Sequence, residues 1–170
     1  MKIWFTILLF LYCASSYGQT SDSISEIRSI VAKINSDSEG YRTKTLENYE
    51  FIGVTDNGST LTGYFRKNEL VKIAVWIGLS HWIVTEEYYL DNSNLIFVYK
   101  KERTSPYRVP GDSFDYMHPE ITMENRCYFK DKKLIKILSK GTSNDPSFKN
   151  DAEEMLADVK KYSELLKKRK

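Results

Sequence analysis

The sequence contains little cysteine, with only Cys13 and Cys127 among 170 residues. Closely spaced cysteine pairs would indicate a zinc site or a disulfide framework, and the chain has no such pair. It also lacks a glycine-rich phosphate loop, an HExxH sequence and a Ser-His-Asp signature. We therefore expect no cofactor, and no motif indicates an enzyme active site.

A strong excess of one charge is also missing. The chain has 25 Lys and Arg against 23 Asp and Glu, which gives a formal net charge of +2. Proteins that bind nucleic acids or anionic membranes through long-range electrostatics usually carry a clearly basic surface. We therefore expect no nucleic-acid partner.

Long apolar runs are absent except at the start, where residues 3–12 are almost entirely apolar. This run of about 10 residues is shorter than the roughly 20 that span a bilayer. Lys2 precedes it, and the small residues Ser16 and Gly18 follow it. The order predicts an export signal that is cleaved after Gly18. The alternative is a core segment at the chain terminus.

Cys13 raises the question of a bacterial lipoprotein, in which a cysteine carries the lipid. Small residues normally precede such a cysteine, whereas Leu11 and the bulky Tyr12 precede this one. We do not expect lipidation. We expect residues 1–18 to be removed and residues 19–170 to form one domain, in the periplasm or outside a Gram-negative bacterium and with no stable membrane span.

Two amphipathic helices are predicted near the ends of this domain. The first extends over about residues 22–35, where apolar residues recur at helical spacing and Ser23 is a suitable N-cap. The second extends over about residues 150–168, where Asn150 can cap and acidic residues suit the positive end of the helix dipole.

Between the helices, about seven strand-like runs occupy residues 47–139. Three consecutive pairs share a pattern in which an aromatic residue precedes a leucine by six positions, across a short polar turn. These pairs are Tyr64 and Leu70, Tyr89 and Leu95, and Tyr128 and Leu134. Two β-branched residues follow each leucine at alternate positions, for example Val71 and Ile73 or Ile96 and Val98. Strand alternation predicts that each such pair shares one face.

The predicted fold class is α+β, a meandering antiparallel sheet with both helices packed on one apolar face. The opposite face carries a mixture that includes Lys72, Lys136, Phe97 and Tyr99. Such a face could line a groove, or it could be covered by loops or by another subunit. The similarity among the hairpins fits either duplication or a shared need to bury one face.

Tandem hairpins of this kind behind an export signal resemble small exported bacterial proteins of uncharacterised function. The resemblance extends over residues 64–137, and it brings no catalytic residue with it.

One long loop, residues 102–122, interrupts the strands and contains three prolines. Long loops in compact domains are usually functional or disordered. Arginine and aromatic residues in a stiffened loop are typical of binding surfaces, although the aromatic residues could instead fold back onto the sheet. The binding candidates in this loop are Arg103, Tyr107, Arg108, Phe114, Tyr116 and His118.

A second candidate is the segment GLSHW, residues 78–82, between two predicted strands. His81 could act as a general acid or base, because imidazole titrates near neutral pH. The alternative is a strand junction at which aromatic side chains pack over the sheet edge. The binding candidates of this segment and its neighbour are Trp76, His81 and Trp82.

By residue type alone, four loop residues could hold a metal ion: Asp112, Asp115, His118 and Glu120. Their spacing matches no metal motif, and a solvated histidine near acids is the alternative that we adopt. Cys127 lies in a predicted strand, where we expect a buried structural thiol and not a nucleophile.

Three functional hypotheses follow. The first is an exported binding or accessory module that recognises a protein, peptide or glycan through loop 102–122 and the outer sheet face. The second is a structural envelope protein that oligomerises through a sheet face or edge. The third is a hydrolase that uses His81 or His118, which requires one of them to converge with carboxylates in a pocket.

Overall fold

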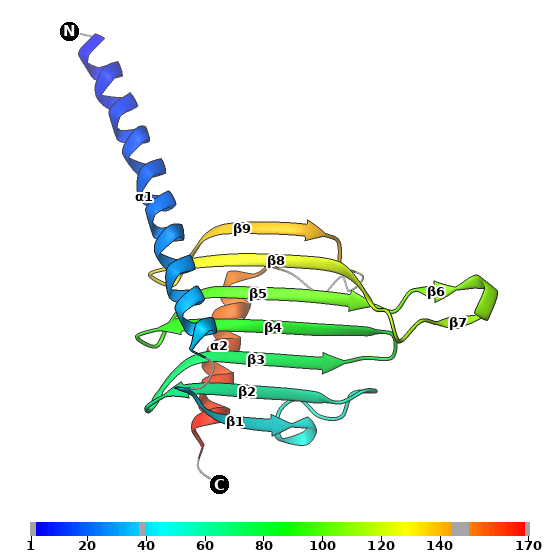
Figure 1. Cartoon of the computed structure of the whole chain (residues 1–170). Coiled ribbons are helices and arrows are strands. Elements are labelled where there is room, and N and C mark those ends of the chain that lie inside the picture. The colour runs from blue at the N-terminus through cyan, green and yellow to red at the C-terminus, as the bar shows by residue number, and fades with distance from the viewer. Residues whose placement is uncertain (1–2, 38–39, 144–149, 169–170) are drawn as a thin grey trace.

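The computed structural model describes residues 3–37, 40–143 and 150–168, with the side chains of the first helix described from residue 20 onward. It has the α+β fold that the sequence predicts, with a seven-stranded antiparallel sheet and two helices (Figure 1). The strand order is β1-β2-β3-β4-β5-β8-β9, so strands that follow one another in the large sheet are also neighbours in space.

The elements have the following bounds. The helices are α1 (Ile3–Ser36) and α2 (Ala152–Lys167), and the short 3-10 turns are η2 (Asn48–Glu50) and η3 (Val109–Gly111). The large sheet contains β1 (Arg42–Glu47), β2 (Ser59–Arg66), β3 (Glu69–Gly78), β4 (Trp82–Asp91), β5 (Asn94–Thr104), β8 (Glu120–Lys130) and β9 (Lys133–Gly141). A small hairpin contains β6 (Tyr107–Arg108) and β7 (Ser113–Phe114).

The two helices lie on opposite faces of the sheet (Figure 1). The prediction that both cover one face is therefore wrong. The side chains that α1 buries against the sheet are Ile24, Ile27 and Ile34, which pack with Val71, Tyr89, Phe97 and Tyr128. The side chains that α2 buries against the other face are Met155, Val159, Tyr162 and Leu166.

A β-bulge at the same place in each repeated hairpin explains this error. In the first hairpin, Phe65 pairs with Leu70 and Tyr64 pairs with Lys72, so Val71 is passed over in the pairing. The residues passed over in the three hairpins are Val71, Ile96 and Ile135. One extra residue of this kind reverses the alternation of side chains along the strand.

The consequence is that each repeated hairpin contributes to both faces. Val71 packs on the side of α1, whereas Ile73 belongs to the core beneath α2. The prediction that these two residues share a face is wrong, and the same correction applies to Ile96 and Val98. The helices accordingly find an apolar surface on each side of the sheet.

The core beneath α2 includes a buried ionic group. Lys100 and Glu86 form an ion pair of 2.9 Å, with side chains 5% and 10% exposed. The Tyr88 hydroxyl donates a hydrogen bond of 2.6 Å to the second Glu86 oxygen and lies 3.4 Å from Asp158 on α2. Burial, and next the nearby charge of Glu86, raise the pKa of the Asp158 carboxyl above its usual range.

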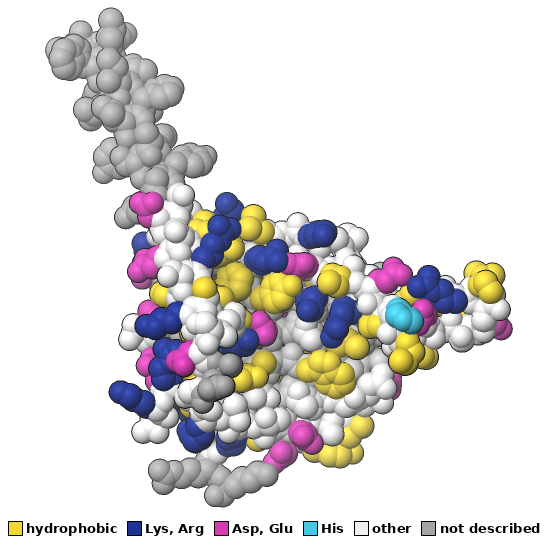
Figure 2. All heavy atoms as spheres, in the orientation of Figure 1, with side chains coloured by type: hydrophobic (Ala, Val, Ile, Leu, Met, Phe, Trp, Pro, Cys, Tyr) yellow, Lys and Arg dark blue, Asp and Glu magenta, His cyan; other side chains and the backbone are white. Residues whose placement is uncertain are grey.

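On the other face, α1 covers only the end of the sheet at which the β2–β3, β4–β5 and β8–β9 turns lie. Between α1 and the small hairpin, hydrophobic and basic side chains lie on the visible surface (Figure 2). We call this uncovered part the outer face. Its strand positions include Trp76 on β3, Ile83 on β4, and Tyr99, Lys101 and Arg103 on β5, all of them half-buried.

The predicted export signal, residues 1–18, and Cys13 fall where side chains are outside the described residues. Within the described residues, no helix has the length and apolar character needed to cross a membrane.

Candidate functional site

The small β6–β7 hairpin projects from the end of the large sheet, between β5 and β8 (Figure 1). Loop 102–122 is shorter than predicted, because β5 continues to Thr104 and β8 begins at Glu120. Arg103 is therefore a residue of a central strand, whereas the sequence assigned it to the loop. The inserted segment is residues 105–119.

The hairpin is held by contacts of its own. The backbone N–H of Asp115 donates a hydrogen bond of 2.8 Å to the Pro106 carbonyl, which joins its two ends. The Tyr107 hydroxyl donates to the Asp112 carboxylate. These contacts give the segment a defined shape although it projects into solvent.

The residues proposed for a metal site were Asp112, Asp115, His118 and Glu120. Arg108 lies between two of their carboxylates, 3.5 Å from Asp115 and 3.3 Å from Glu120. His118 is highly exposed and its ring nitrogen Nδ1 lies 3.1 Å from Asp115. Across the described parts of the chain, no group of three or more His, Cys, Asp or Glu side chains is arranged to hold a metal ion.

His81 connects the β3–β4 turn to this hairpin. Its ring stacks on Phe114, with centroids 5.0 Å apart and planes at 18°, and it meets the edge of Trp82 at 4.6 Å. Phe114 also contacts Tyr107 at 5.4 Å and Tyr116 at 6.1 Å. The two candidate segments, which the sequence presented separately, therefore form one aromatic cluster.

Backbone hydrogen bonds fix the same junction. The N–H of Ser105 donates to the His81 carbonyl at 2.8 Å, and the N–H of Leu79 donates to the Trp82 carbonyl at 2.9 Å. These bonds hold the turn and the base of the hairpin together independently of the aromatic stack.

A pocket of about 330 Å³ lies at this junction. Its volume is at the lower end of the usual range for small-molecule sites, so it suits a group of about one ring. Its lining consists of Asn57, Trp76, Leu79, Ser80, His81, Trp82, Ile83, Ser105 and Tyr116. We call it the aromatic pocket.

Gly78 makes room for one wall of the aromatic pocket. A Cβ atom at this position would lie 2.6 Å from Cη2 of Trp76 and 2.6 Å from Cβ of Asn57. The N–H of Gly78 donates to the Gly58 carbonyl at 2.8 Å, and the Asn57 N–H donates to the Gly78 carbonyl at 3.1 Å. The absence of a side chain at Gly78 thus lets the Trp76 ring and the 57–58 segment approach each other.

Two polar atoms at or beside the aromatic pocket have unused hydrogen-bonding capacity. Among the described residues, Nε1 of Trp82 and Nε of Arg103 are buried donors with no hydrogen-bond partner. Trp82 lines the pocket, and Arg103 lies directly opposite the lining residue Ile83 on the neighbouring strand. Buried donors are nearly always paired in folded proteins, so these two atoms are exceptions. Both are closed to solvent, and a ligand reaches either of them only if neighbouring side chains shift.

The groups that could act as a nucleophile or as a general acid or base lie in different surroundings. They are Cys127, His81 and His118. Burial raises the pKa of the Cys127 thiol to about 11, which keeps it protonated near neutral pH and confirms the prediction of a buried cysteine. His81 packs between aromatic rings. His118 has Asp115 beside it, and its side chain is 79% exposed.

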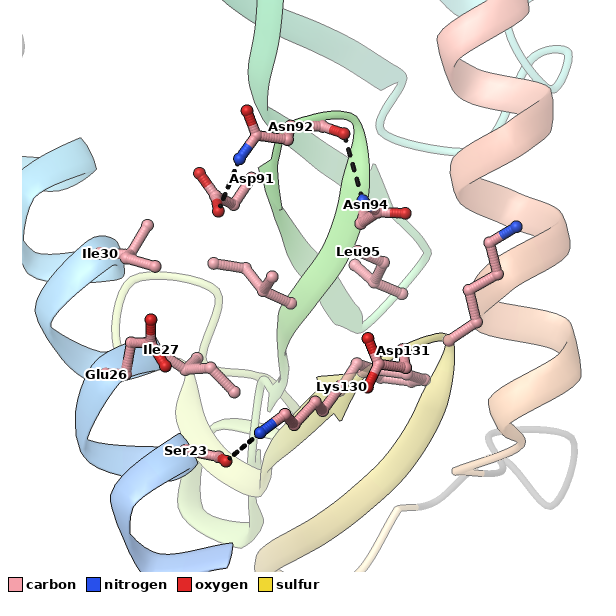
Figure 3. Close-up of a pocket in the computed structure, with 13 residues that line it drawn as sticks. Ser23, Glu26, Ile27, Ile30, Asp91, Asn92, Asn94, Leu95, Lys130 and Asp131 are labelled. Carbon is pink, nitrogen blue, oxygen red and sulfur yellow. Dashed lines mark hydrogen bonds between the residues drawn. The ribbon is translucent and has the colours of Figure 1, made fainter. Parts of the chain in front are cut away.

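A larger hollow of about 520 Å³ lies at the other end of the sheet, between α1 and the β4–β5 and β8–β9 turns (Figure 3). Several of its polar side chains are held by neighbours in the hollow. Lys130 donates to Ser23 at 2.8 Å, and Asn92 donates to Asp91 at 3.2 Å. We therefore place the candidate site at the aromatic pocket, where aromatic faces and unpaired donors meet.

Sequence reasoning identified the aromatic residues of the site but missed Asn57, Ile83 and Ser105. Asn57 was part of an Asn-Gly pair, which is typical of a turn and carries no signal of binding. Ile83 and Ser105 reach the pocket only because β4 and the base of the hairpin are brought together. Comparisons of the chain with protein-family models, curated proteins and solved structures find no match.

Proposed function

We propose that the protein is an exported binding module whose aromatic pocket receives a ring-shaped part of its ligand. The observation that carries this proposal is the convergence of Trp76, His81, Trp82 and Tyr116 on one open pocket. These residues come from β3, the β3–β4 turn, β4 and the hairpin segment. Aromatic side chains gathered at an accessible, well-supported position are typical of binding sites.

The exposure of the hairpin side chains supports a role outside the core. Tyr116 is 60% exposed and Phe114 is 36% exposed. The stack of Phe114 on His81 and the Ser105 backbone bond hold the hairpin in place before a ligand arrives. Such preorganisation reduces the entropy that is lost on binding.

The exported location rests on the sequence of residues 1–18, with its positive start, apolar run and small residues before the cleavage point. The second hypothesis, assembly through a sheet face or edge, gains less support at the β9 edge. The free edge strand β9 carries Lys133, Lys136 and Lys140, and lysines along an edge discourage pairing with another sheet.

Trp76 and Trp82 allow a direct test, because the only other tryptophan is Trp4. The full chain with Trp4→Phe would be screened against a glycan array and a peptide library. Each hit would then be titrated while tryptophan emission is recorded. We expect a saturable change in emission, because both remaining tryptophans line the pocket.

Two variants decide the outcome. Trp76→Ala should abolish binding of the hits, as measured by calorimetry. Tyr49→Ala removes an 85% exposed aromatic side chain that does not line the pocket, and it should leave binding intact. If folded Trp76→Ala protein binds every hit as well as the parent does, the pocket is not the binding site and the proposal fails.

A further inference from the structure

We infer that the ligand of the aromatic pocket is an acidic glycan, with a sugar ring against Trp76 and an anionic group bound by Arg103. This inference rests on the function proposed above and specifies the class of ligand. The carboxylate of a uronic acid and a sugar sulfate share the required chemistry, and the experiment distinguishes them.

Three positions form a row across the outer face. Gly78 on β3 pairs with Ile83 on β4, and Ile83 pairs with Arg103 on β5. Directly opposite residues share a face, so the Arg103 side chain lies beside that of Ile83. The Trp76 ring lies against Gly78 at the other end of the row. Gly78 with the Trp76 ring against it, Ile83 and Arg103 therefore occupy successive positions across three strands.

The dimensions of this row limit the ligand. Neighbouring strands are spaced about 4.8 Å apart, so Gly78 and Arg103 are about 10 Å apart across the sheet. A ligand that contacts both ends must be extended, with an apolar ring face at one end and an anionic group near the other. Two linked sugar units with one acidic substituent have this shape.

On the outer face, the acidic side chains of the strands have basic partners. Glu87 forms an ion pair of 2.8 Å with Lys72, and Glu124 pairs with Arg126. These pairs provide a basic partner for each of the two strand carboxylates, and Glu124 also lies directly opposite Lys101 of β5. Beside the pocket, the Asp56 carboxylate accepts a hydrogen bond from Ser80. Neither ion pair involves Arg103.

Arg103 thus provides the uncompensated charge on this face, whereas Lys101 has Glu124 directly opposite it. Lys101 lies 5.8 Å from the centre of the Tyr99 ring, in a cation–π contact. In the described parts of the chain, Arg103 has no carboxylate within ion-pair distance, and its Nε is buried without a hydrogen-bond partner. A guanidinium without a carboxylate partner suits a planar anion, which it binds through its terminal N–H groups, because Nε itself is closed to solvent. Charge complementarity therefore selects an anionic ligand.

The place of the row in the sheet favours a glycan over an extended peptide. Peptides that bind sheets usually add a strand at an edge, through main-chain hydrogen bonds. β3, β4 and β5 are interior strands, and each has a paired strand on both sides. The ligand must be recognised through side chains alone. Those around the row supply an amide, hydroxyls and aromatic faces, which suit sugar hydroxyls and the apolar face of a sugar ring.

The test measures binding of four probes to the full chain by calorimetry. They are oligogalacturonate for carboxylates, dextran sulfate oligosaccharide for sulfates, neutral dextran oligosaccharide of matched length, and oligoglutamate as an acidic peptide. We expect one acidic sugar to bind at least tenfold more tightly than neutral dextran or oligoglutamate. Preference between carboxylate and sulfate identifies the anionic group.

Variants assign the effect to Arg103. Arg103→Gln should weaken binding of the acidic sugar roughly tenfold or more. Arg103→Lys keeps the charge but not the planar guanidinium, so its affinity should lie between those of the parent and Arg103→Gln. Lys160→Gln removes one positive charge from α2 on the opposite face and should have no effect. Circular dichroism checks that each variant is folded.

The outcomes separate this inference from the proposed function. Loss of binding in Trp76→Ala with no change in Arg103→Gln would keep the pocket as the site and overturn the acidic ligand. The inference of an acidic glycan would also be overturned by any of three results: neutral dextran binds as tightly as the acidic sugars, oligoglutamate binds more tightly, or neither acidic sugar binds. Unchanged affinity for the acidic sugar in both variants would overturn the inference and the proposed function together.

Discussion

The imidazole of His81 stacks on the phenyl ring of Phe114, with centroids 5.0 Å apart and an angle of 18° between the planes. His81 belongs to the turn between two central strands, whereas Phe114 ends the second strand of the projecting hairpin. The contact therefore holds a binding element on a scaffold. Rigid positioning of a loop by a sheet is a common way to build a site.

His81→Ala should loosen the hairpin without unfolding the protein. The stack contributes about 1 kcal/mol, and the sheet does not depend on it. We expect faster tryptic cleavage after Arg108, which is exposed in the hairpin, and little change in the melting temperature. His118→Ala is the control, since its ring lies outside the stack. Equal cleavage rates for His81→Ala and the parent would contradict this role.

Gly78→Ala should disturb the pocket from beneath. The new methyl group would lie 2.6 Å from both the Trp76 ring and Asn57, so at least one of them must move. Overpacking of this kind destabilises by about 1–3 kcal/mol. Urea denaturation would measure the loss, and a shift in tryptophan emission would report the displaced ring.

Gly111→Ala is the matched control for Gly78→Ala. Its Cβ would meet nothing closer than 3.5 Å, from Oγ of Ser113. We expect nearly unchanged stability and emission for this variant. Unchanged stability and emission for Gly78→Ala as well would show that Trp76 does not pack against Gly78 in solution.

The fold class and the strands from Ser59 onward could be predicted because period-two patterns and polar turns are local properties of the sequence. The first strand was misplaced, since β1 is Arg42–Glu47 and a 3-10 turn follows it where the strands were expected to begin. The face of the sheet on which each side chain lies could not be predicted. Val71 and Ile73 are both apolar, and both faces of the sheet are covered at that end, so the hydrophobic pattern does not reveal the bulge between them. A bulge depends on the pairing with the neighbouring strand, which a single strand does not encode.

The candidate site was predictable in its residue types and not in its assembly. Trp76, His81 and Phe114 were identified because aromatic side chains near turns are typical of binding surfaces. Their convergence depends on where β5 ends and β8 begins, which places the hairpin against the β3–β4 turn. Arg103 was misplaced in the loop for the same reason, since strand ends are the least certain part of a sequence-based prediction.

Export predicts a defined mature N-terminus. When the full chain is expressed in a Gram-negative host, mass spectrometry of the exported protein should show that it begins at Gln19. Gly18→Tyr should block cleavage, because the position before the cut requires a small residue, whereas Tyr17→Leu should leave it unchanged. Detection of the uncleaved chain in the cytoplasm as the sole product would contradict export.

The Asp158 carboxyl predicts a specific dependence of stability on pH. Burial and the charge of Glu86 raise its pKa in the folded protein, while the unfolded chain titrates near the ordinary value of 3.8. The unfolded chain therefore loses this proton first as the pH rises. The protonated carboxyl of Asp158 therefore contributes to the stability of the folded state below pH 3.8, and this contribution is lost as the pH rises through the raised pKa.

Asp158→Asn keeps the shape of the side chain and removes its charge. The variant should be more stable than the parent at neutral pH, and the difference should shrink as the pH falls toward about 4. Urea denaturation at a series of pH values measures this. Glu164→Gln, at an exposed position of the same helix, should show no such convergence. If Asp158→Asn is less stable than the parent at neutral pH, the charged carboxylate must instead stabilise the fold through its neighbours Lys100 and Tyr88.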